Sequence, residues 1–193
     1  MQPKIRDERR DDATAVLGVV REAFGDEGDA VASIWSALRP LGLVRTSLVA
    51  EVAGRVVGHV GVSACWLDAR RELVDVLVLS PLAVLPAHQR SGTGTALLAA
   101  AVERAGALGA PALFLEGSPD YYGSRGFEHA SPLGFAPASV RTPDRAFQVA
   151  RLAALQDWMT GRLVYPDVWW RHDAAGLRDP VLAQLEEFLG RSS

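Results

Sequence analysis

A glycine-containing loop between a strand pattern and a helix pattern constrains the fold of this chain more than any other feature. The valine-rich segment Leu73–Val84 predicts a strand, and the Ala/Leu-rich segment 95–109 predicts a helix that ends at Gly109. The loop between them reads Gln89-Arg90-Ser91-Gly92-Thr93-Gly94-Thr95. Glycines at such a junction let successive backbone N–H groups surround an anion, together with the unpaired N–H groups of the helix start. The loop therefore predicts a phosphate site; the alternative is a helix entry that binds nothing.

Two familiar phosphate-binding loops do not fit this segment. A dinucleotide-binding loop has its glycines at the strand end and a third small residue in the helix, but here residues 86–91 intervene and Leu97 takes the third position. The nucleoside-triphosphate loop ends in Gly-Lys-Ser/Thr, and Lys4 is the only lysine of the chain. The sequence therefore excludes the second class and disfavours the first.

Composition favours a folded globular protein in which any anion-binding site is confined to a small part of the surface. The 193 residues are 49% hydrophobic and 22% charged, which suits one globular domain or a domain with a small extension. The net charge of −3 argues against binding nucleic acid through the whole surface. Cys65 is the only cysteine and the four histidines are widely spaced, so neither a disulfide nor a metal is expected.

The chain shows no pattern of a secreted or membrane protein. Its first twelve residues are charged, and no apolar run follows them as in a secretory signal. The apolar stretch 73–87 is too short and too interrupted to cross a membrane. We therefore expect a cytoplasmic protein with no membrane or nucleic-acid partner.

The remaining patterns predict a mixed α/β order. A hairpin is expected around the Ala53-Gly54 turn, and the strand Leu73–Val84 is expected to become irregular at Ser80-Pro81, because proline cannot donate to the ladder. Asp11 or Asp12 is expected to cap the first helix. Other expected strands are 4–6, 47–52, 55–65, 112–116, 127–133 and 146–152; other expected helices are about 13–24, 29–38, 118–125 and 180–189.

A second motif follows 28 residues after Gly94 and reads Tyr122-Gly123-Ser124-Arg125-Gly126-Phe127. With the run LAVLPAHQRSGTGTALL, it resembles the GNAT superfamily of acetyl-CoA-dependent N-acyltransferases, whose motifs are Gln/Arg-x-x-Gly-x-Gly/Ala and Tyr-x-x-x-Gly-Phe. The resemblance implies an α/β (α+β) GNAT-like fold: a central, mostly antiparallel sheet with a splayed strand pair and helices on both faces. It places the domain at residues 1–152, followed by an extension, 153–193, packed on it.

The resemblance also implies where acetyl-CoA binds. The pantetheine arm would pair with the strand end, and the pyrophosphate would bind in the loop. The implied cofactor residues are Ala83, Val84, Leu85, Gln89, Arg90, Ser91, Gly92, Thr93, Gly94 and Thr95. An irregular strand at Ser80-Pro81 would agree with this, since it leaves backbone groups for a ligand to pair with.

The implied reaction is direct attack of a primary amine of a small molecule or protein on the acetyl thioester. A strand N–H near Val84 would stabilise the oxyanion. Tyr122 matches the position of the family's proton donor to the leaving sulfur, and a phenol stays protonated at neutral pH. The alternative for Tyr122 is an aromatic that only shapes the pocket, and Tyr121 is expected in the core.

The general base is less clear. Glu116, at the end of a predicted strand, is the first candidate, although such carboxylates are often solvated or capping. Asp75 and His59 are weaker candidates that also suit polar strand positions. The family often has an asparagine between this strand and the tyrosine, and segment 117–121 lacks it. This departure leaves the cofactor contacts on that side open.

Other functions remain as alternatives. A non-catalytic acyl-CoA-binding or regulatory module would keep the loop, and a nucleotide-binding protein of another fold would bind NAD or ATP instead. Ser63 lacks the second glycine of a hydrolase elbow, and Cys65 is expected to be inert packing. The aromatic residues of the tail are expected to pack onto the domain; an acceptor pocket or a homodimer contact are the alternatives. These tail aromatics are Trp158, Tyr165, Trp169 and Trp170.

Overall fold

The computed structural model describes residues 3–191, which form two compact units. The first unit comprises the chain up to Ala64 together with Val78–Gly109. The second comprises Cys65–Leu77 and the chain from Ala110 onward. Both contain strands and helices, and most strand pairs are antiparallel, as predicted. The predicted boundary after Leu152 and the splayed strand pair stay predictions.

The first unit is built on the sheet order β1-β2-β3-β4. These strands are β1 (Lys4–Asp7), β2 (Val44–Val52), β3 (Arg55–Ala69) and β4 (Leu73–Val84), of which β3 and β4 also supply residues to the second unit. The hairpin between β2 and β3 is confirmed: Val52 pairs with Arg55, and the turn residues Ala53 and Gly54 have φ of 50° and 77°. Both values lie in the left-handed region that such tight turns require.

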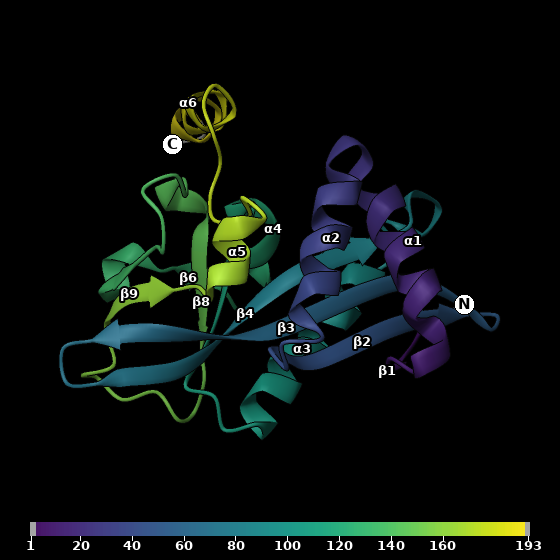
Figure 1. Cartoon of the computed structure of the whole chain (residues 1–193), viewed down its shortest axis with the longest axis horizontal. Helices are drawn as coiled ribbons and strands as arrows, with labels where there is room; N and C mark the ends of the chain where they lie inside the picture. Colours follow the sequence, from purple (N-terminus) through teal and green to yellow (C-terminus); the bar gives the residue numbers. More distant parts are fainter. Residues whose placement is uncertain (1–2, 192–193) are drawn as a thin grey trace. The chain divides into compact units, whose positions relative to one another are not determined.

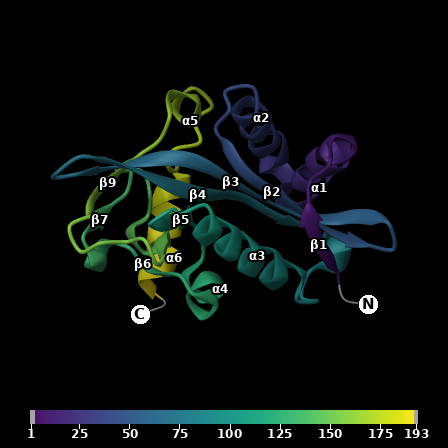
Figure 2. The same ribbon diagram turned by 90° about the horizontal axis from the view of Figure 1, so that it is seen from below.

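Helices cover both faces of this sheet, as predicted. Helices α1 (Ala13–Phe24) and α2 (Gly28–Leu38) lie on one face, and α3 (Thr93–Ala107) lies on the other (Figures 1 and 2). Two glycines of β3 permit this close packing. A Cβ at Gly61 would lie 2.4 Å from the Trp35 ring of α2, and one at Gly58 would lie 2.9 Å from Leu97 Cδ1 of α3. The sheet therefore holds α3, and the loop before it, close to its surface.

One local prediction for the first unit needs correction. Asp12 does not cap α1 with its side chain. Instead its carboxylate pairs with the Arg6 guanidinium and accepts a hydrogen bond from the Arg9 N–H at 2.7 Å, because a 3₁₀ turn, Arg10–Asp12, precedes the helix. The strand β4 spans Leu73–Val84, the bounds predicted for it, and Ser80-Pro81 within it is a cis peptide bond.

The second unit contains shorter strands. Strand β5 (Ala112–Glu116) pairs antiparallel with β8 (Phe147–Arg151), which also pairs with β6 (Glu128–His129). Strand β9 (Gly161–Val164) pairs antiparallel with residues 66–69 of β3 and parallel with β7 (Phe135–Ala136). The helices are α4 (Pro119–Tyr122), α5 (Asp167–Arg171) and α6 (Val181–Arg191).

The predicted strand 127–133 is wrong over most of its length. Only Glu128–His129 pair as a strand, and Ser131–Leu133 form a 3₁₀ turn. Pro132 has no N–H for a ladder, and Gly134 ends the turn with φ of 89°. The apolar pattern of this segment instead reflects packing.

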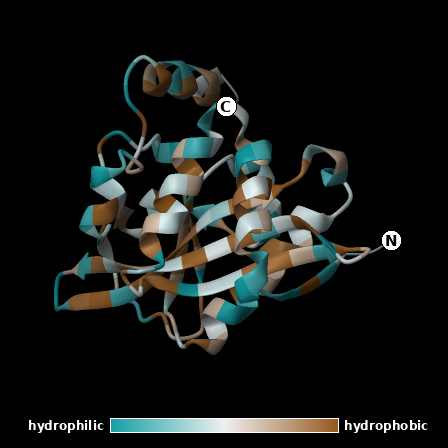
Figure 3. Ribbon diagram, turned by 45° about the vertical axis from the view of Figure 1, so that its right-hand side comes forward, coloured by the Kyte–Doolittle hydropathy of each residue, from teal (hydrophilic) through white to brown (hydrophobic). Residues whose placement is uncertain are grey.

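The residues after Leu152 contribute to the core of the second unit. Leu163, Tyr165 and Trp169 are buried, which confirms packing for two of the four tail aromatics, whereas Trp170 is 44% exposed. Helix α6 has alternating apolar and polar bands (Figure 3); Leu189 is buried and Phe188 is exposed. No helix within residues 3–191 is long and apolar enough to cross a membrane.

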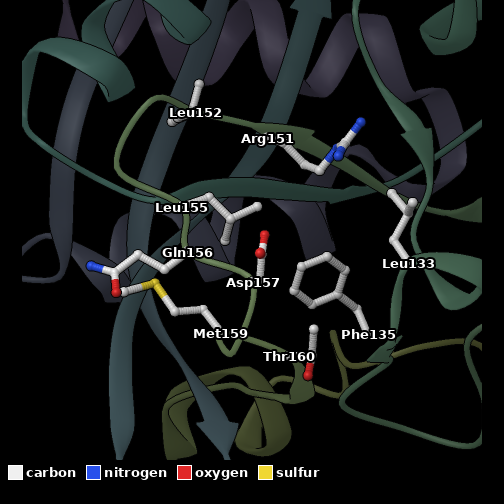
Figure 4. A pocket seen from close by; sticks show the side chains of 9 residues that line it. All are labelled: Leu133, Phe135, Arg151, Leu152, Leu155, Gln156, Asp157, Met159 and Thr160. Atoms are coloured by element: carbon white, nitrogen blue, oxygen red, sulfur yellow. The ribbon is translucent and has the colours of Figure 1, made fainter.

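The second unit also contains a cavity of about 320 Å³ that none of the predicted site residues lines. Apolar side chains, including those of Phe135 and Met159, lie beside the polar Arg151 and Asp157 (Figure 4). Arg151 is already paired with Glu128 at 2.9 Å. The lining residues are Leu133, Phe135, Arg151, Leu152, Leu155, Gln156, Asp157, Met159 and Thr160.

Candidate functional site

The end of β4 directs one backbone amide away from its neighbouring strand. The Leu85 N–H donates to the Val57 carbonyl of β3 at 2.9 Å. Because alternate residues of a strand direct their N–H and C=O groups to opposite edges, those of Val84 point away from β3. The Val84 carbonyl accepts a hydrogen bond from Gln89 Nε2 at 3.0 Å. The N–H and C=O of Val84 thus lie on the edge of β4 opposite β3.

Left-handed backbone shapes the loop that follows. A 3₁₀ turn, Pro86–His88, leads into it, and Arg90 and Gly92 then adopt φ of 56° and 86°. A Cβ at Gly92 would meet nothing within 4 Å, so the backbone angle, not crowding, accounts for glycine there. Arg90, Ser91 and Gly92 are exposed. The loop therefore presents its backbone to solvent with open space beside it.

Helix α3 begins directly after this turn. Its first backbone bond runs from the Ala96 N–H to the Gly92 carbonyl at 3.0 Å, so the N–H groups of Thr93 and Gly94 have no acceptor within the helix. Gly92, at the N-cap position, has no side chain to cap them. The Ser91 hydroxyl donates to the His88 carbonyl at 2.6 Å and braces the loop from within. This end of the helix carries partial positive charge and suits a phosphate.

The candidate base Glu116, at the end of β5 in the second unit, is held by two hydroxyl groups. Tyr165 Oη donates to Glu116 Oε1 at 3.0 Å, and Thr142 Oγ1 donates to the same oxygen at 3.2 Å. Burial raises the pKa of Glu116, while the two hydrogen bonds and the charge of Arg141 oppose that rise. The carboxyl is therefore easier to protonate than a solvent-exposed glutamate.

The Tyr122 ring packs on Gly117, the residue after Glu116. A Cβ at Gly117 would lie 2.4 Å from Tyr122 Cε2. The turn before β8 and β8 itself fix this glycine: the Gly117 N–H donates to the Ala146 carbonyl at 2.9 Å, and the Gly117 carbonyl accepts from Gln148 Nε2 at 3.1 Å. The ring of the predicted proton donor is therefore held against the residue that follows the predicted base, within the second unit.

The phenol of Tyr122 is held in its protonated form. Burial, together with Tyr121, raises its pKa to about 12, and the charge of Arg125 lowers it. The group therefore stays protonated well above neutral pH. Phe127 packs edge-on against its ring at a centroid distance of 5.8 Å. The predicted cofactor residues, by contrast, all belong to the first unit.

Four further side chains occupy different surroundings. Tyr121 was expected in the core, but it is only half-buried, and the Arg125 guanidinium lies 4.0 Å from its ring centroid. His59 is fully buried with Nε2 2.9 Å from Ser47 Oγ, and burial lowers its pKa to about 3. Cys65 is buried, and burial raises its thiol pKa, which confirms inert packing. Asp75 is exposed.

Sequence reasoning missed the partners of Glu116. Thr142 lies 26 residues and Tyr165 49 residues further along the chain, so no local pattern links them to Glu116. The cluster of tail aromatics was a partial signal, because Tyr165 stacks on Trp169 at a centroid distance of 4.8 Å. Within residues 3–191, no group of three or more His, Cys, Asp and Glu side chains is placed to bind a metal.

Comparison with known proteins gives a consistent answer. Residues 4–130 match the family described as acetyltransferase (GNAT) domain. The uncharacterized N-acetyltransferase YjhQ of Escherichia coli is 29% identical over 161 residues, which cover 80% of this chain and 87% of that protein.

Two solved structures are similar over most of their length. The GNAT family N-acetyltransferase YhbS of Escherichia coli, in complex with CoA, has a TM-score of 0.80 and 30% identity, covering 89% of this chain and 93% of its own. A GNAT family acetyltransferase of Brucella melitensis, in complex with acetyl-CoA, has a TM-score of 0.70 and 27% identity; the match covers 86% of this chain and 97% of that one.

Proposed function

The chain belongs to the GNAT acetyltransferase family, and from this premise we propose that it moves the acetyl group of acetyl-CoA to a primary amine of a small molecule or protein. The observation that carries the proposal is the exposed loop before α3, with left-handed turns at Arg90 and Gly92. The CoA and acetyl-CoA complexes of the two similar structures support it. No metal takes part in the proposed reaction.

The residues present fit the phosphates of CoA. The backbone N–H groups of segment 89–95 would bind the pyrophosphate, with Arg90 as a charged neighbour. Each charge-assisted hydrogen bond contributes roughly 1.5 to 3 kcal/mol, whereas the helix dipole contributes only about 0.3 to 1 kcal/mol. Three or four such bonds therefore outweigh the dipole. The segment Ala83–Leu85 would run beside the pantetheine arm, with Val84 pairing as in an added strand while the Leu85 N–H stays bonded to Val57.

Each proposed catalytic residue has one task. When bound, acetyl-CoA supplies an activated thioester. The Val84 N–H, directed away from β3, donates to the carbonyl oxygen as negative charge develops there. Glu116 takes the proton from the amine, directly or through water, and Tyr122 donates a proton to the departing sulfur. The raised pKa of Tyr122 keeps that proton available, and the raised pKa of Glu116 favours proton uptake.

A binding assay and a turnover assay test the proposal together. Calorimetry measures CoA binding to the purified protein, and a thiol-reactive dye follows CoA release from acetyl-CoA in the presence of a panel of amines. Amine-dependent release supports the transferase. Binding of CoA without release from any amine would indicate the non-catalytic acyl-CoA-binding module instead. Absence of binding to well-folded protein would refute both.

A further inference from the structure

We propose that Tyr165 is a positioning residue for Glu116: its hydroxyl and that of Thr142 hold one carboxylate oxygen, so that the other oxygen faces the amine proton. The inference rests on the proposed function, in which Glu116 is the general base. It assigns a task to the segment after β9, which lies outside the residues matched by the family, 4–130. The acetyltransferase site would then depend on the C-terminal segment for its chemistry as well as its packing.

The backbone of Tyr165 is fixed on both sides. Val164, the residue before it, pairs with Trp66 of β3 as the end of the β9 ladder. The Tyr165 carbonyl accepts a hydrogen bond from Trp170 Nε1 of α5 at 3.2 Å. These bonds set where the Tyr165 side chain starts, independently of Glu116.

The ring of Tyr165 is fixed as well. It stacks on Trp169 with an interplanar angle of 20° and is only 4% exposed. A phenol held in this way loses little further freedom when its hydroxyl donates to Glu116. Burial and the neighbouring Glu116 raise the Tyr165 pKa well above 10, so the hydroxyl is a permanent donor. The Tyr165 hydroxyl is thus held in position to donate to Glu116.

Both hydroxyl groups reach the same atom. Tyr165 and Thr142 donate to Glu116 Oε1, at 3.0 and 3.2 Å. This arrangement orients the carboxylate and leaves Oε2 to take up a proton. Arg141 adds positive charge nearby, and Cys65, whose thiol is protonated, lies on the side of Tyr165. The groups around Glu116 therefore donate to its ionised form, carry positive charge or are neutral.

The sign of the effect follows from these contacts. Burial raises the pKa of Glu116, and the hydrogen bonds from Tyr165 and Thr142 lower it. A general base works in its ionised form, so its activity is lost as the pH falls through its pKa. Removing the Tyr165 hydroxyl removes a stabiliser of the ionised form, which raises the Glu116 pKa. The acidic limb of the rate profile should then move to higher pH.

The variant Tyr165→Phe tests this with little change in packing, since it keeps the stacked ring. We expect kcat/KM, measured with the most active amine of the panel, to fall about tenfold at acidic pH and to recover at alkaline pH. Thr142→Val should show the same pattern, and Thr142→Ser, which keeps a hydroxyl, should restore the wild-type profile. A uniform loss at every pH would overturn the proposal, because it would indicate a structural role alone.

A second measurement does not depend on finding the amine. The side-chain carboxyl resonance of Glu116 is identified in ¹³C-glutamate-labelled protein by its loss in Glu116→Gln, and its titration is compared between wild type and Tyr165→Phe. A midpoint at higher pH in the variant supports the proposal, and an unchanged midpoint overturns it. Failure of wild-type protein to acetylate any amine would instead defeat the proposed function, whatever the midpoint does.

Discussion

Replacing Gly117 with alanine tests whether the placement of the Tyr122 ring on this glycine matters for acetyl transfer. The added Cβ would lie 2.4 Å from Tyr122 Cε2, where ordinary contact begins at 3.4 Å, so the ring must move by 3.4 − 2.4 = 1.0 Å. The backbone cannot yield easily, because Ala146 and Gln148 hold the N–H and the carbonyl of Gly117. The phenol must therefore shift.

A displacement of that size has a large expected effect on turnover. Misplacing a catalytic group by about 1 Å costs on the order of 100-fold in rate. We therefore expect Gly117→Ala to lower kcat about 100-fold in the thiol-release assay. CoA affinity by calorimetry should stay unchanged, because the substitution touches no residue of the loop at 89–95. The tight contact should also cost about 1 to 3 kcal/mol of stability.

Gly123→Ala is the matched control. Gly123 follows Tyr122 directly, has φ of −58°, and a Cβ there would meet nothing within 4 Å. Its replacement should therefore leave both turnover and stability near wild type. Thermal unfolding of both variants establishes that each is folded at the assay temperature. If folded Gly117→Ala turns over like Gly123→Ala, the placement of the Tyr122 ring has no part in catalysis and the reasoning fails.

Three further predictions concern the loop, the proton donor and pH. Gly92→Glu should lower CoA affinity by more than 100-fold, on the order of two lost charge-assisted hydrogen bonds plus charge repulsion. The control Gly106→Glu, on the exposed surface of α3, should leave the affinity unchanged. Equal affinities of the two variants in calorimetry would contradict the loop assignment. Tyr122→Phe should reduce kcat about 10- to 1000-fold with CoA affinity intact, as measured by thiol release; undiminished turnover would leave Tyr122 a packing residue. Pairing with Arg6 lowers the Asp12 pKa to about 2, so the pair stabilises the fold above about pH 4 and this contribution is lost as the pH falls toward 2. Urea denaturation should show that loss in wild type and not in Asp12→Asn.

Much of the first unit was predictable because its signals are local. The hairpin at Ala53-Gly54, the helix α3 and the loop before it follow from turn residues, apolar period and glycine placement. The cap of α1 was not predictable in this way, since Asp12 is engaged by Arg6 of β1. A residue that suits a cap can thus be claimed by a stronger charged partner.

The second unit was predicted less well because its elements are short and depend on distant partners. Strands β7 and β9 are two and four residues long, and each forms only by pairing, β9 with the end of β3. No period can be recognised over so few residues. The burial of Tyr165 and Trp169 likewise depends on that pairing.

By itself the sequence determined the loop, the Tyr122 motif and hence the family, because glycine positions and motif spacing act within a few residues of each other. The tertiary structure decided the burial, the hydrogen-bond partners and hence the ionisation of Glu116. Its neighbours Thr142 and Tyr165 are 26 and 49 residues away, and its surroundings are buried only once β5, β8 and β9 are in place. The ionisation of a carboxyl depends on burial and on its donors, and a folded chain fixes both by bringing distant residues together.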